Sequence, residues 1–189
     1  MGVLATEAPR TQEEFTCDWT VFETSLGWMA FSYRRELLTE VTFGHSSPQE
    51  ARQVLHALQL ATEPAGRLPA WARELRTQLE RVAKGKSQDF SGVKLDLRHL
   101  TPLGQQVTAA CRAIPWGCTL TYKQLAEQVG RPGAARAVGN VMASNRFPLV
   151  VPCHRVVGTS GGLGGFSAPG GIETKRWLLN QESPLLSAP

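Results

Sequence analysis

Long apolar runs, clustered cysteines and aromatic residues are all scarce in this chain of 189 residues. No stretch approaches the ~18 consecutive apolar residues of a membrane-spanning helix. Residues 1–15 carry three acids and a proline where a signal peptide has a basic end and an apolar core. The four cysteines fit neither a C-x-x-C metal motif nor the density of a disulfide-stapled domain. We therefore expect no membrane segment, no secretion and a reducing, cytoplasmic compartment.

Acidic residues are scarce in the second half of the chain. Residues 98–189 contain nine Lys or Arg and three Asp or Glu, a formal net charge of +6, whereas residues 1–97 carry a net charge of −2. A basic surface attracts polyanions such as nucleic acid, although a solvated surface without a partner gives the same count. The chain length suits one or two globular domains, and we expect two, residues 1–97 and 98–189.

The first half has the pattern of a small mixed α/β unit. Residues 20–43 are rich in β-branched and aromatic side chains and are interrupted at residues 25–27 and 34–36 by turn-forming or charged clusters. This pattern predicts two or three antiparallel strands. Another short strand is expected over residues 93–97.

Two helices are predicted between these strands. Ser47 followed by Pro48 is typical of a capped helix start, so a helix is expected from about Pro48 to Leu60. A second helix is expected to end at Gly85, and its apolar face consists of Trp71, Leu75, Leu79 and Val82.

Isolated candidate ligands in the first half do not form a metal motif. Cys17, His45 and His56 lack the short spacing that binds a metal ion. We assign no metal site here.

The second half contains three predicted helices. Thr101 and Pro102 predict a helix that ends before Pro115, and Thr121 is placed to cap the next helix. Residues 133–145 predict the third. The last two helices, joined by a short turn that contains Gly, have the pattern of a helix-turn-helix. An ordinary helical hairpin gives the same pattern.

The last of these helices carries one long, positively charged side chain, that of Arg136, among small residues. Ala135, Val138 and Met142 share one face by their spacing, which places Arg136 on another face. Small neighbours allow close approach to a nucleic-acid backbone. We interpret this helix as suited to inserting one side chain into a duplex rather than to reading many base edges.

The clearest chemical signal is the Cys153-His154 pair between two apolar, strand-like segments. It precedes a loop, residues 158–171, in which seven of 14 residues are Gly. A free thiol with a pKa of ~8.5 is mostly protonated at neutral pH, so His154 is the candidate base. Adjacent residues in a strand point to opposite faces, so the pair can cooperate only if the backbone turns or a water bridges them. A buried structural thiol is the alternative.

A final helix is predicted from about Ile172 to Glu182. Glu182 is placed to orient His154 in a Cys-His-Glu relay, and a surface carboxylate is the alternative. The Gly-rich loop also suggests a nucleotide site. Neither G-x-G-x-x-G nor G-x-x-x-x-G-K-[ST] occurs, so we predict no nucleotide cofactor.

Together, residues 101–182 resemble the O6-alkylguanine-DNA alkyltransferases, also called methylated-DNA–protein-cysteine methyltransferases. The matching motifs are I-P-x-G at 114–117, T-Y-x-x-L-A at 121–126, A-A-R-A-V-G at 134–139, V-P-C-H-R-V-V at 151–157 and K-x-W-L-L at 175–179. The resemblance implies an α+β fold. It pairs a ribonuclease H-like N-terminal α/β domain with a mainly helical C-terminal domain that contains a winged helix-turn-helix.

The resemblance also implies an activity, the direct repair of alkylated DNA. Cys153 would take the alkyl (methyl) group from O6-alkylguanine, irreversibly and once per molecule, after the nucleotide is flipped out of the duplex. His154 would act as base through a water and Glu182 would hold its imidazole. Asn145 would brace the turn that carries the site, and Tyr122 would donate a proton to the departing guanine.

DNA-contacting and pocket residues are implied in the same way. The partner is double-stranded DNA with O6-alkylguanine, bound through its minor groove, and Arg136 would fill the gap in the base stack. The expected DNA contacts are Tyr122, Ala135, Arg136 and Gly139. The expected pocket residues are Met142, Pro148, Val156, Phe166 and Ser167. We expect a monomer without cofactor or metal, nucleoid-associated in a prokaryote.

Two departures and three alternatives accompany this interpretation. Phe166 stands where many relatives have Tyr, which removes a hydroxyl contact, and the first half lacks the Cys/His set with which some members bind zinc. The alternatives are a module that flags alkylated bases without transfer, a cysteine hydrolase, and a helix-turn-helix regulator. The combination of Cys153, His154 and Glu182 favours alkyl transfer.

Overall fold

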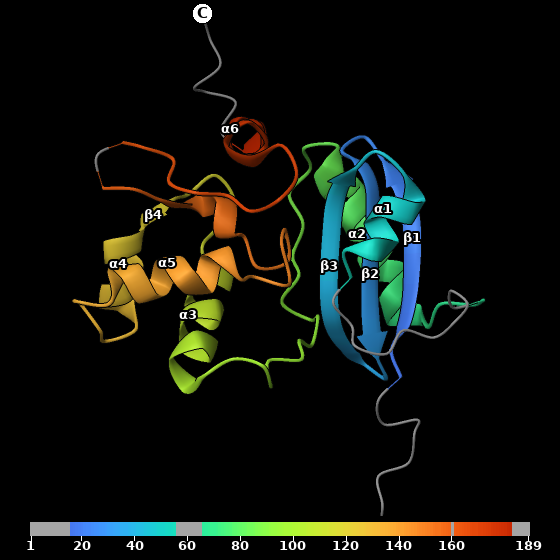
Figure 1. Ribbon diagram of the computed structural model, residues 1–189, viewed down its shortest axis with the longest axis horizontal. Coiled ribbons are helices and arrows are strands. Elements are labelled where there is room, and N and C mark those ends of the chain that lie inside the picture. Colours follow the sequence, from blue (N-terminus) through green and yellow to red (C-terminus); the bar gives the residue numbers. More distant parts are fainter. Residues whose placement is uncertain (1–15, 56–65, 160, 183–189) are drawn as a thin grey trace, which may run out of the picture.

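The computed structural model describes residues 16–55, 66–159 and 161–182. It has an α+β fold in which a small sheet with two helices lies beside a mainly helical part (Figure 1). The antiparallel sheet has the order β1-β2-β3. Its strands are β1 (Asp18–Thr24), β2 (Gly27–Arg34) and β3 (Leu37–His45).

The predicted interruptions are the two hairpin turns of this sheet. Gly27, with φ of 85°, supplies the left-handed conformation at the first turn, and Arg35 adopts φ of 55° at the second. Phe31 and Tyr33 of β2 point to one face, while Ala30 points to the other. The expectation of antiparallel strands over residues 20–43 is confirmed.

Two helices cover the two faces of the sheet. Helix α1 (Pro48–Gln53) begins as predicted, because the Ser47 side chain accepts a hydrogen bond from the Glu50 amide. The prediction that it reaches Leu60 is wrong. The chain tightens after Gln53, where the Leu55 amide donates to the Arg52 carbonyl, and residues 56–60 lie outside the described residues.

On the other face lies α2 (Ala70–Ala83), which buries Leu75 and Leu79 completely. Trp71 is half-buried and meets the Tyr33 ring edge-on, with 5.3 Å between centroids. Gly85, at φ of 70°, follows the helix end as expected.

The prediction of a strand over residues 93–97 is wrong. The structure has only a single β-bridge there, between Leu38 and Leu95. The Leu38 amide donates to the Lys94 carbonyl and the Asp96 amide donates to the Leu38 carbonyl. The chain then turns away, because the Asp96 carboxylate accepts a hydrogen bond from the Arg98 amide.

The helical part carries the remaining elements. They are α3 (Pro102–Arg112), β4 (Leu120–Thr121), α4 (Tyr122–Gln128), α5 (Ala135–Ala143), η2 (Cys153–Arg155), β5 (Val156–Val157) and α6 (Gly171–Glu182). Thr101 and Thr121 cap α3 and α4 as predicted, and Gln124 completes a capping box with Thr121. Parallel pairing of β4 with β5 places the start of α4 beside the end of η2.

Of the two strands expected around Cys153, only the second exists, as the two-residue β5. Before Cys153 the chain forms a compact turn in which the Val151 amide donates to the Phe147 carbonyl and Leu149 adopts φ of 71°. The Asn145 side chain closes this turn, so an extended strand cannot form there.

One hydrophobic cluster joins the two parts. It extends from Phe31 and Phe43 of the sheet through Val107 and Val138 to Leu178 of α6. None of the described helices is both long and apolar enough to cross a membrane.

Candidate active site

Cys153 and His154 lie on η2, a single turn of 3₁₀ helix. The Cys153 amide donates to the Val151 carbonyl and the Arg155 amide donates to the Pro152 carbonyl. The backbone therefore turns at the pair, which removes the obstacle that an extended strand would pose. Both side chains are buried.

Glu182, at the end of α6, is the acceptor around which the site is organised. Its Oε1 lies 2.8 Å from Nε2 of His154 and accepts a hydrogen bond from Nη2 of Arg155 at 2.9 Å. Its Oε2 accepts from Nε of Arg155 at 2.8 Å and from the Gly117 amide at 3.2 Å. Glu182 is buried, so the alternative of a surface carboxylate does not apply.

These contacts fix the protonation of the pair. Burial opposes ionisation of Glu182, but hydrogen bonds from His154 and Arg155 hold its pKa below the usual value. Burial lowers the pKa of His154, and the contact with Glu182 offsets this only in part. A neutral imidazole that faces a carboxylate must carry its proton on Nε2. Nδ1 of His154 is then a buried base, and it has no hydrogen-bond partner among the described protein atoms.

The thiol of Cys153 is held in its protonated form. Burial raises the pKa of Cys153, while hydrogen bonding from Asn145 and the positive charge of Lys175 act in the opposite direction. A thiol in this state reacts only when a base removes its proton at the moment of attack.

Asn145 braces the turn before the cysteine, as expected from the resemblance. Its Nδ2 donates to the Val151 carbonyl at 2.9 Å, and its Oδ1 accepts from the Phe147 amide at 3.0 Å. These two bonds hold Leu149 in the left-handed region, which costs a non-glycine residue about 1–2 kcal/mol.

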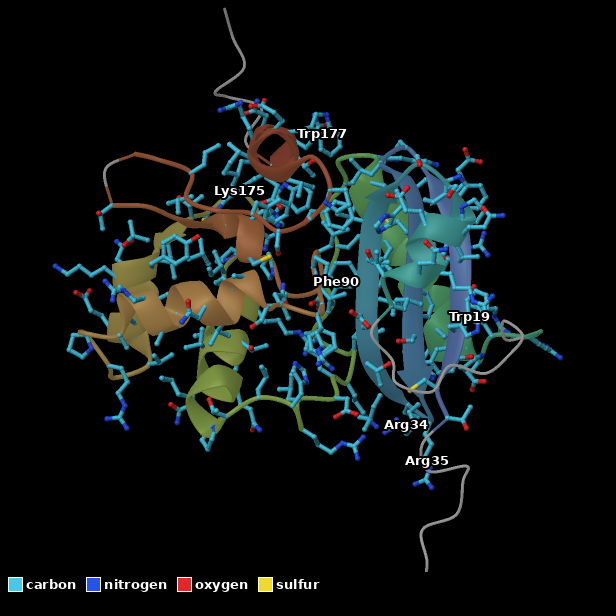
Figure 2. All side chains as sticks on the ribbon, viewed as in Figure 1. Trp19, Arg34, Arg35, Phe90, Lys175 and Trp177 are labelled. Carbon is cyan, nitrogen blue, oxygen red and sulfur yellow. The ribbon has the colours of Figure 1, made fainter. Side chains whose placement is uncertain are left out.

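Lys175 of α6 is a site residue for which the sequence analysis predicted no role. It is completely buried, and its Nζ donates to the Val156 carbonyl at 2.7 Å and to the Gly165 carbonyl at 3.3 Å. It extends from α6 toward the body of the helical part, whereas Trp177 lies on the outer side (Figure 2). Its spacing of three and seven residues from Leu178 and Glu182 was the available signal.

Arg155 also had no predicted role. Besides its bonds to Glu182, its Nη1 donates to the Ile114 carbonyl at 2.6 Å, and its guanidinium lies 5.5 Å from the Trp116 ring centroid. It therefore ties η2 to the segment after α3.

A pocket of about 380 Å³ opens beside Cys153. Its wall includes Tyr122, Gly139, Met142, Cys153, Phe166 and Ser167. The structure thus brings together most of the residues expected at the substrate. Pro148 lines a second, adjoining pocket instead. Val156 is fully buried and lines neither pocket.

Tyr122 is held against the Gly-rich loop. A Cβ atom at Gly164 would come within 2.8 Å of the Tyr122 hydroxyl, so the loop can approach the ring only because residue 164 is glycine. Burial, and next the proximity of Cys153, raise the pKa of Tyr122, which therefore carries its proton at neutral pH.

Helix α5 places Arg136 as the sequence predicted. Val138 and Met142 are buried, while Arg136 is exposed and Ala135 and Gly139 are half-buried. Among the described residues, no three His, Cys, Asp or Glu side chains lie close enough to hold a metal ion. His56 lies outside that part of the chain.

Residues 102–184 match the family model described as 6-O-methylguanine DNA methyltransferase, DNA binding domain. The crystal structure of Mycobacterium tuberculosis OGT in complex with DNA is 33% identical, with a TM-score of 0.70, over 88% of this chain and 93% of that one. The chain belongs to the methylated-DNA–protein-cysteine methyltransferase family.

Other members of the methylated-DNA–protein-cysteine methyltransferase family agree with this assignment. The Salmonella typhimurium methyltransferase is 52% identical over 86 residues, which are 46% of this chain and 49% of that protein. The chain therefore matches about half the length of this curated relative. The Pyrococcus kodakaraensis O6-methylguanine-DNA methyltransferase structure, at 24% identity and a TM-score of 0.66, shares the fold over 88% of this chain and 98% of that one.

Proposed function

We propose that this protein repairs alkylated DNA by one irreversible transfer of an alkyl (methyl) group from O6-alkylguanine to Cys153. The observation that carries the proposal is the buried His154–Glu182 hydrogen bond directly beside a buried thiol. It leaves Nδ1 of His154 as the base for Cys153, through one water. Residues 1–97 and 98–189 would form the two domains of the enzyme.

The remaining side chains have tasks in the transition state. Guanine leaves with the electron pair of the carbon–oxygen bond, so a proton donor lowers the barrier. Tyr122 lines the same pocket as Cys153 and holds its proton at neutral pH. We assign the donation of this proton to Tyr122. Met142, Phe166 and Ser167 would surround the flipped base, and Asn145 would brace the turn that carries Cys153.

DNA recognition falls to α4 and α5, which we interpret as the helix-turn-helix of a winged domain beside a ribonuclease H-like sheet. A base inside a duplex cannot be reached, and extruding it costs a few kcal/mol. Exposed Arg136 would enter the vacated stack from the minor groove, with Ala135 and Gly139 close to the backbone. The mycobacterial relative was crystallised in complex with DNA, which supports a DNA partner for this monomer.

The test is intact-protein mass after incubation with a duplex that contains one O6-methylguanine. One added methyl group that maps to Cys153, no further turnover and no change in Cys153→Ala are the expected results. Tight lesion binding without a mass change would replace the proposal with a recognition module. Repeated turnover of a small ester would indicate a hydrolase, and sequence-selective footprints a regulator.

A further inference from the structure

A pocket of about 680 Å³ has no part in the proposed repair reaction. Its walls come from three segments: residues 87–97, the second half of α3 with the chain that follows it, and the turn before η2. It shares no lining residue with either pocket at the thiol. Its volume is that of a small-molecule site, about 300–1,000 Å³.

Two aromatic rings belong to the largely apolar lining of this pocket. Eleven of the 18 lining residues are apolar. Phe90 is buried and lies between the sheet and the helical part (Figure 2). Trp116 is half-buried, and the guanidinium of Arg155 lies 5.5 Å from its ring centroid. Aromatic rings pack favourably against one another and against guanidinium groups, so these walls suit a flat aromatic ligand.

Arg112 of α3 brings a positive charge to the same pocket. Its Nη2 donates to the carbonyls of Phe90 and Val93, the latter at 2.7 Å. Its Nε is buried and has no partner among the described protein atoms. Burial lowers the pKa of Arg112, and the charge of Asp89 opposes this shift only in part. A guanidinium stays ionised even so, and its charge is held here with reduced hydration.

No carboxylate in the described part of the chain forms an ion pair with Arg112. Asp89, which also lines the pocket, uses both of its oxygens for Ser91, accepting from the amide and from the hydroxyl at 2.8 Å each. Arg155, the other cation of the lining, is paired with Glu182 at 2.8 Å. Arg112 is therefore the charge that an anionic ligand would neutralise.

We propose that this pocket binds a small aromatic carboxylate, with the ring against Phe90 and Trp116 and the carboxylate on Arg112. Hydrogen bonds between a guanidinium and a carboxylate are about twice as strong as those between neutral groups. The charge therefore decides which aromatic compounds bind. A single unpaired cation suits one negative charge better than the two charges of a phosphate ester. The inference goes beyond the proposed function and does not depend on it.

The pocket places its ligand next to the reactive pair. Pro152 lines it and directly precedes Cys153, while Arg155 directly follows His154 and holds Glu182. Neither Cys153 nor His154 lines it. A bound carboxylate would thus contact the residues on both sides of the pair without reaching the thiol.

The probe is 2-naphthoate, and 2-naphthamide is its neutral counterpart of similar shape. Nuclear magnetic resonance of the isotope-labelled full chain follows the indole N–H signals during each titration. The Trp116 signal should shift saturably with 2-naphthoate, with a Kd of about 1 mM or tighter for a ligand of this size. The signal of the exposed Trp177 should stay in place. 2-Naphthamide should bind at least about tenfold more weakly.

Two variants separate the charge from the space. Arg112→Met removes the charge and should weaken 2-naphthoate binding by about tenfold or more, with little effect on 2-naphthamide. Ala109→Phe keeps Arg112 and fills the pocket from an exposed position of α3, so it should abolish binding of both probes. Arg81→Met and Gln106→Phe are the matched controls, because both residues are exposed and neither lines the pocket.

Binding that is lost in Ala109→Phe and kept in the two controls, with 2-naphthoate preferred over 2-naphthamide, would support the inference. It would be overturned by a Trp116 signal that does not shift, by equal affinities of the wild type for the two probes, or by full 2-naphthoate binding in Ala109→Phe. These outcomes decide the question even where Arg112→Met fails to fold. Absence of alkyl transfer to Cys153 would overturn the proposed function alone.

Discussion

Nε2 of His154 lies 2.8 Å from Oε1 of Glu182, and this contact sets which imidazole nitrogen is basic. Glu182→Gln replaces a pure acceptor with a group that also donates. We expect alkyl transfer to slow by roughly a hundredfold, at the lower end of what general-base catalysis contributes, with DNA binding retained. Rates on a lesion duplex and binding to an unmodified duplex measure the two effects.

The matched control for that variant is Glu173→Gln on the exposed side of the same helix, where the carboxylate pairs only with Arg176 among the described contacts. Removing one partner of a buried ion pair costs about 3–5 kcal/mol. Rates are therefore compared well below the Tm of Glu182→Gln. An unchanged rate in Glu182→Gln would show that the carboxylate has only a structural role.

The buried imidazole of His154 predicts a loss of stability in mild acid. Burial lowers the pKa of His154 below the ordinary value of 6.5. Below pH 6.5 the unfolded chain therefore binds a proton that the native state does not, and this group contributes up to about 1.4 kcal/mol per pH unit. We expect the free energy of unfolding in urea to fall between about pH 7 and pH 5. His154→Gln should flatten that fall, and an equally steep fall in the variant would contradict the prediction.

Arg136 is expected to matter only where a base must leave a duplex. Arg136→Ala should slow repair of O6-methylguanine in double-stranded DNA. The activation free energy should rise by at most the few kcal/mol that extrusion of the base costs. The variant's reaction with free O6-benzylguanine should be unaffected. Arg81→Ala, an exposed arginine of α2, serves as the charge-matched control. Equal losses on both substrates would exclude the proposed insertion into the stack.

Burial raises the pKa of Cys153, and the ammonium of Lys175 opposes this shift while it donates to the carbonyls of Val156 in β5 and Gly165 in the Gly-rich loop. Lys175→Met removes this charge and is expected to raise the pKa of the thiol further. The rate of reaction with free O6-benzylguanine should fall, and its rise with pH should shift to higher pH. Arg176→Met, the exposed neighbouring cation, should leave the pH profile in place. A profile of unchanged position in Lys175→Met would show that Lys175 only tethers the loop.

Arg35 is strained at the turn between β2 and β3. Its φ of 55° costs a side-chain-bearing residue about 1–2 kcal/mol. Glycine would relieve this strain, but it loses about 0.5–1 kcal/mol more conformational entropy on folding, which offsets part of the gain. Arg35→Gly should therefore raise the free energy of unfolding by about 0.5–1 kcal/mol. Its exposed position in Figure 2 leaves few other contacts to lose. Urea denaturation at neutral pH measures the change, and a decrease would contradict it.

The sequence predicted correctly the helix starts that depend on contacts between residues close together in the chain. Caps at Ser47, Thr101 and Thr121 start their helices where expected, because a side-chain oxygen satisfies a free amide within three residues. The turn before Cys153 was missed. It depends on Asn145 reaching Val151, and a run of apolar residues between them gives the same pattern as a strand.

The sequence predicted only those site residues whose chemistry is recognisable without knowledge of their partners. Cys153, His154 and Glu182 are chemically suggestive residues wherever they lie, so the sequence identified them. The roles of Arg155 and Lys175 depend on carbonyls 41 and 19 residues away. The periodicity of a helix or strand does not predict contacts over such distances in the sequence. The approach of β3 to the reactive thiol is likewise a property of packing between distant segments.

The backbone contacts of β3 have one more consequence. Its outward amides at Leu38 and Val41 donate to carbonyls of Lys94 and Arg146, so the rest of the chain occupies positions that a foreign strand would otherwise take. Sheets with an open edge recruit other chains and aggregate. The segments around Lys94 and Arg146, which follow the sheet in the chain, thus cover its β3 edge, and a fragment that ends before both of them would be prone to self-association.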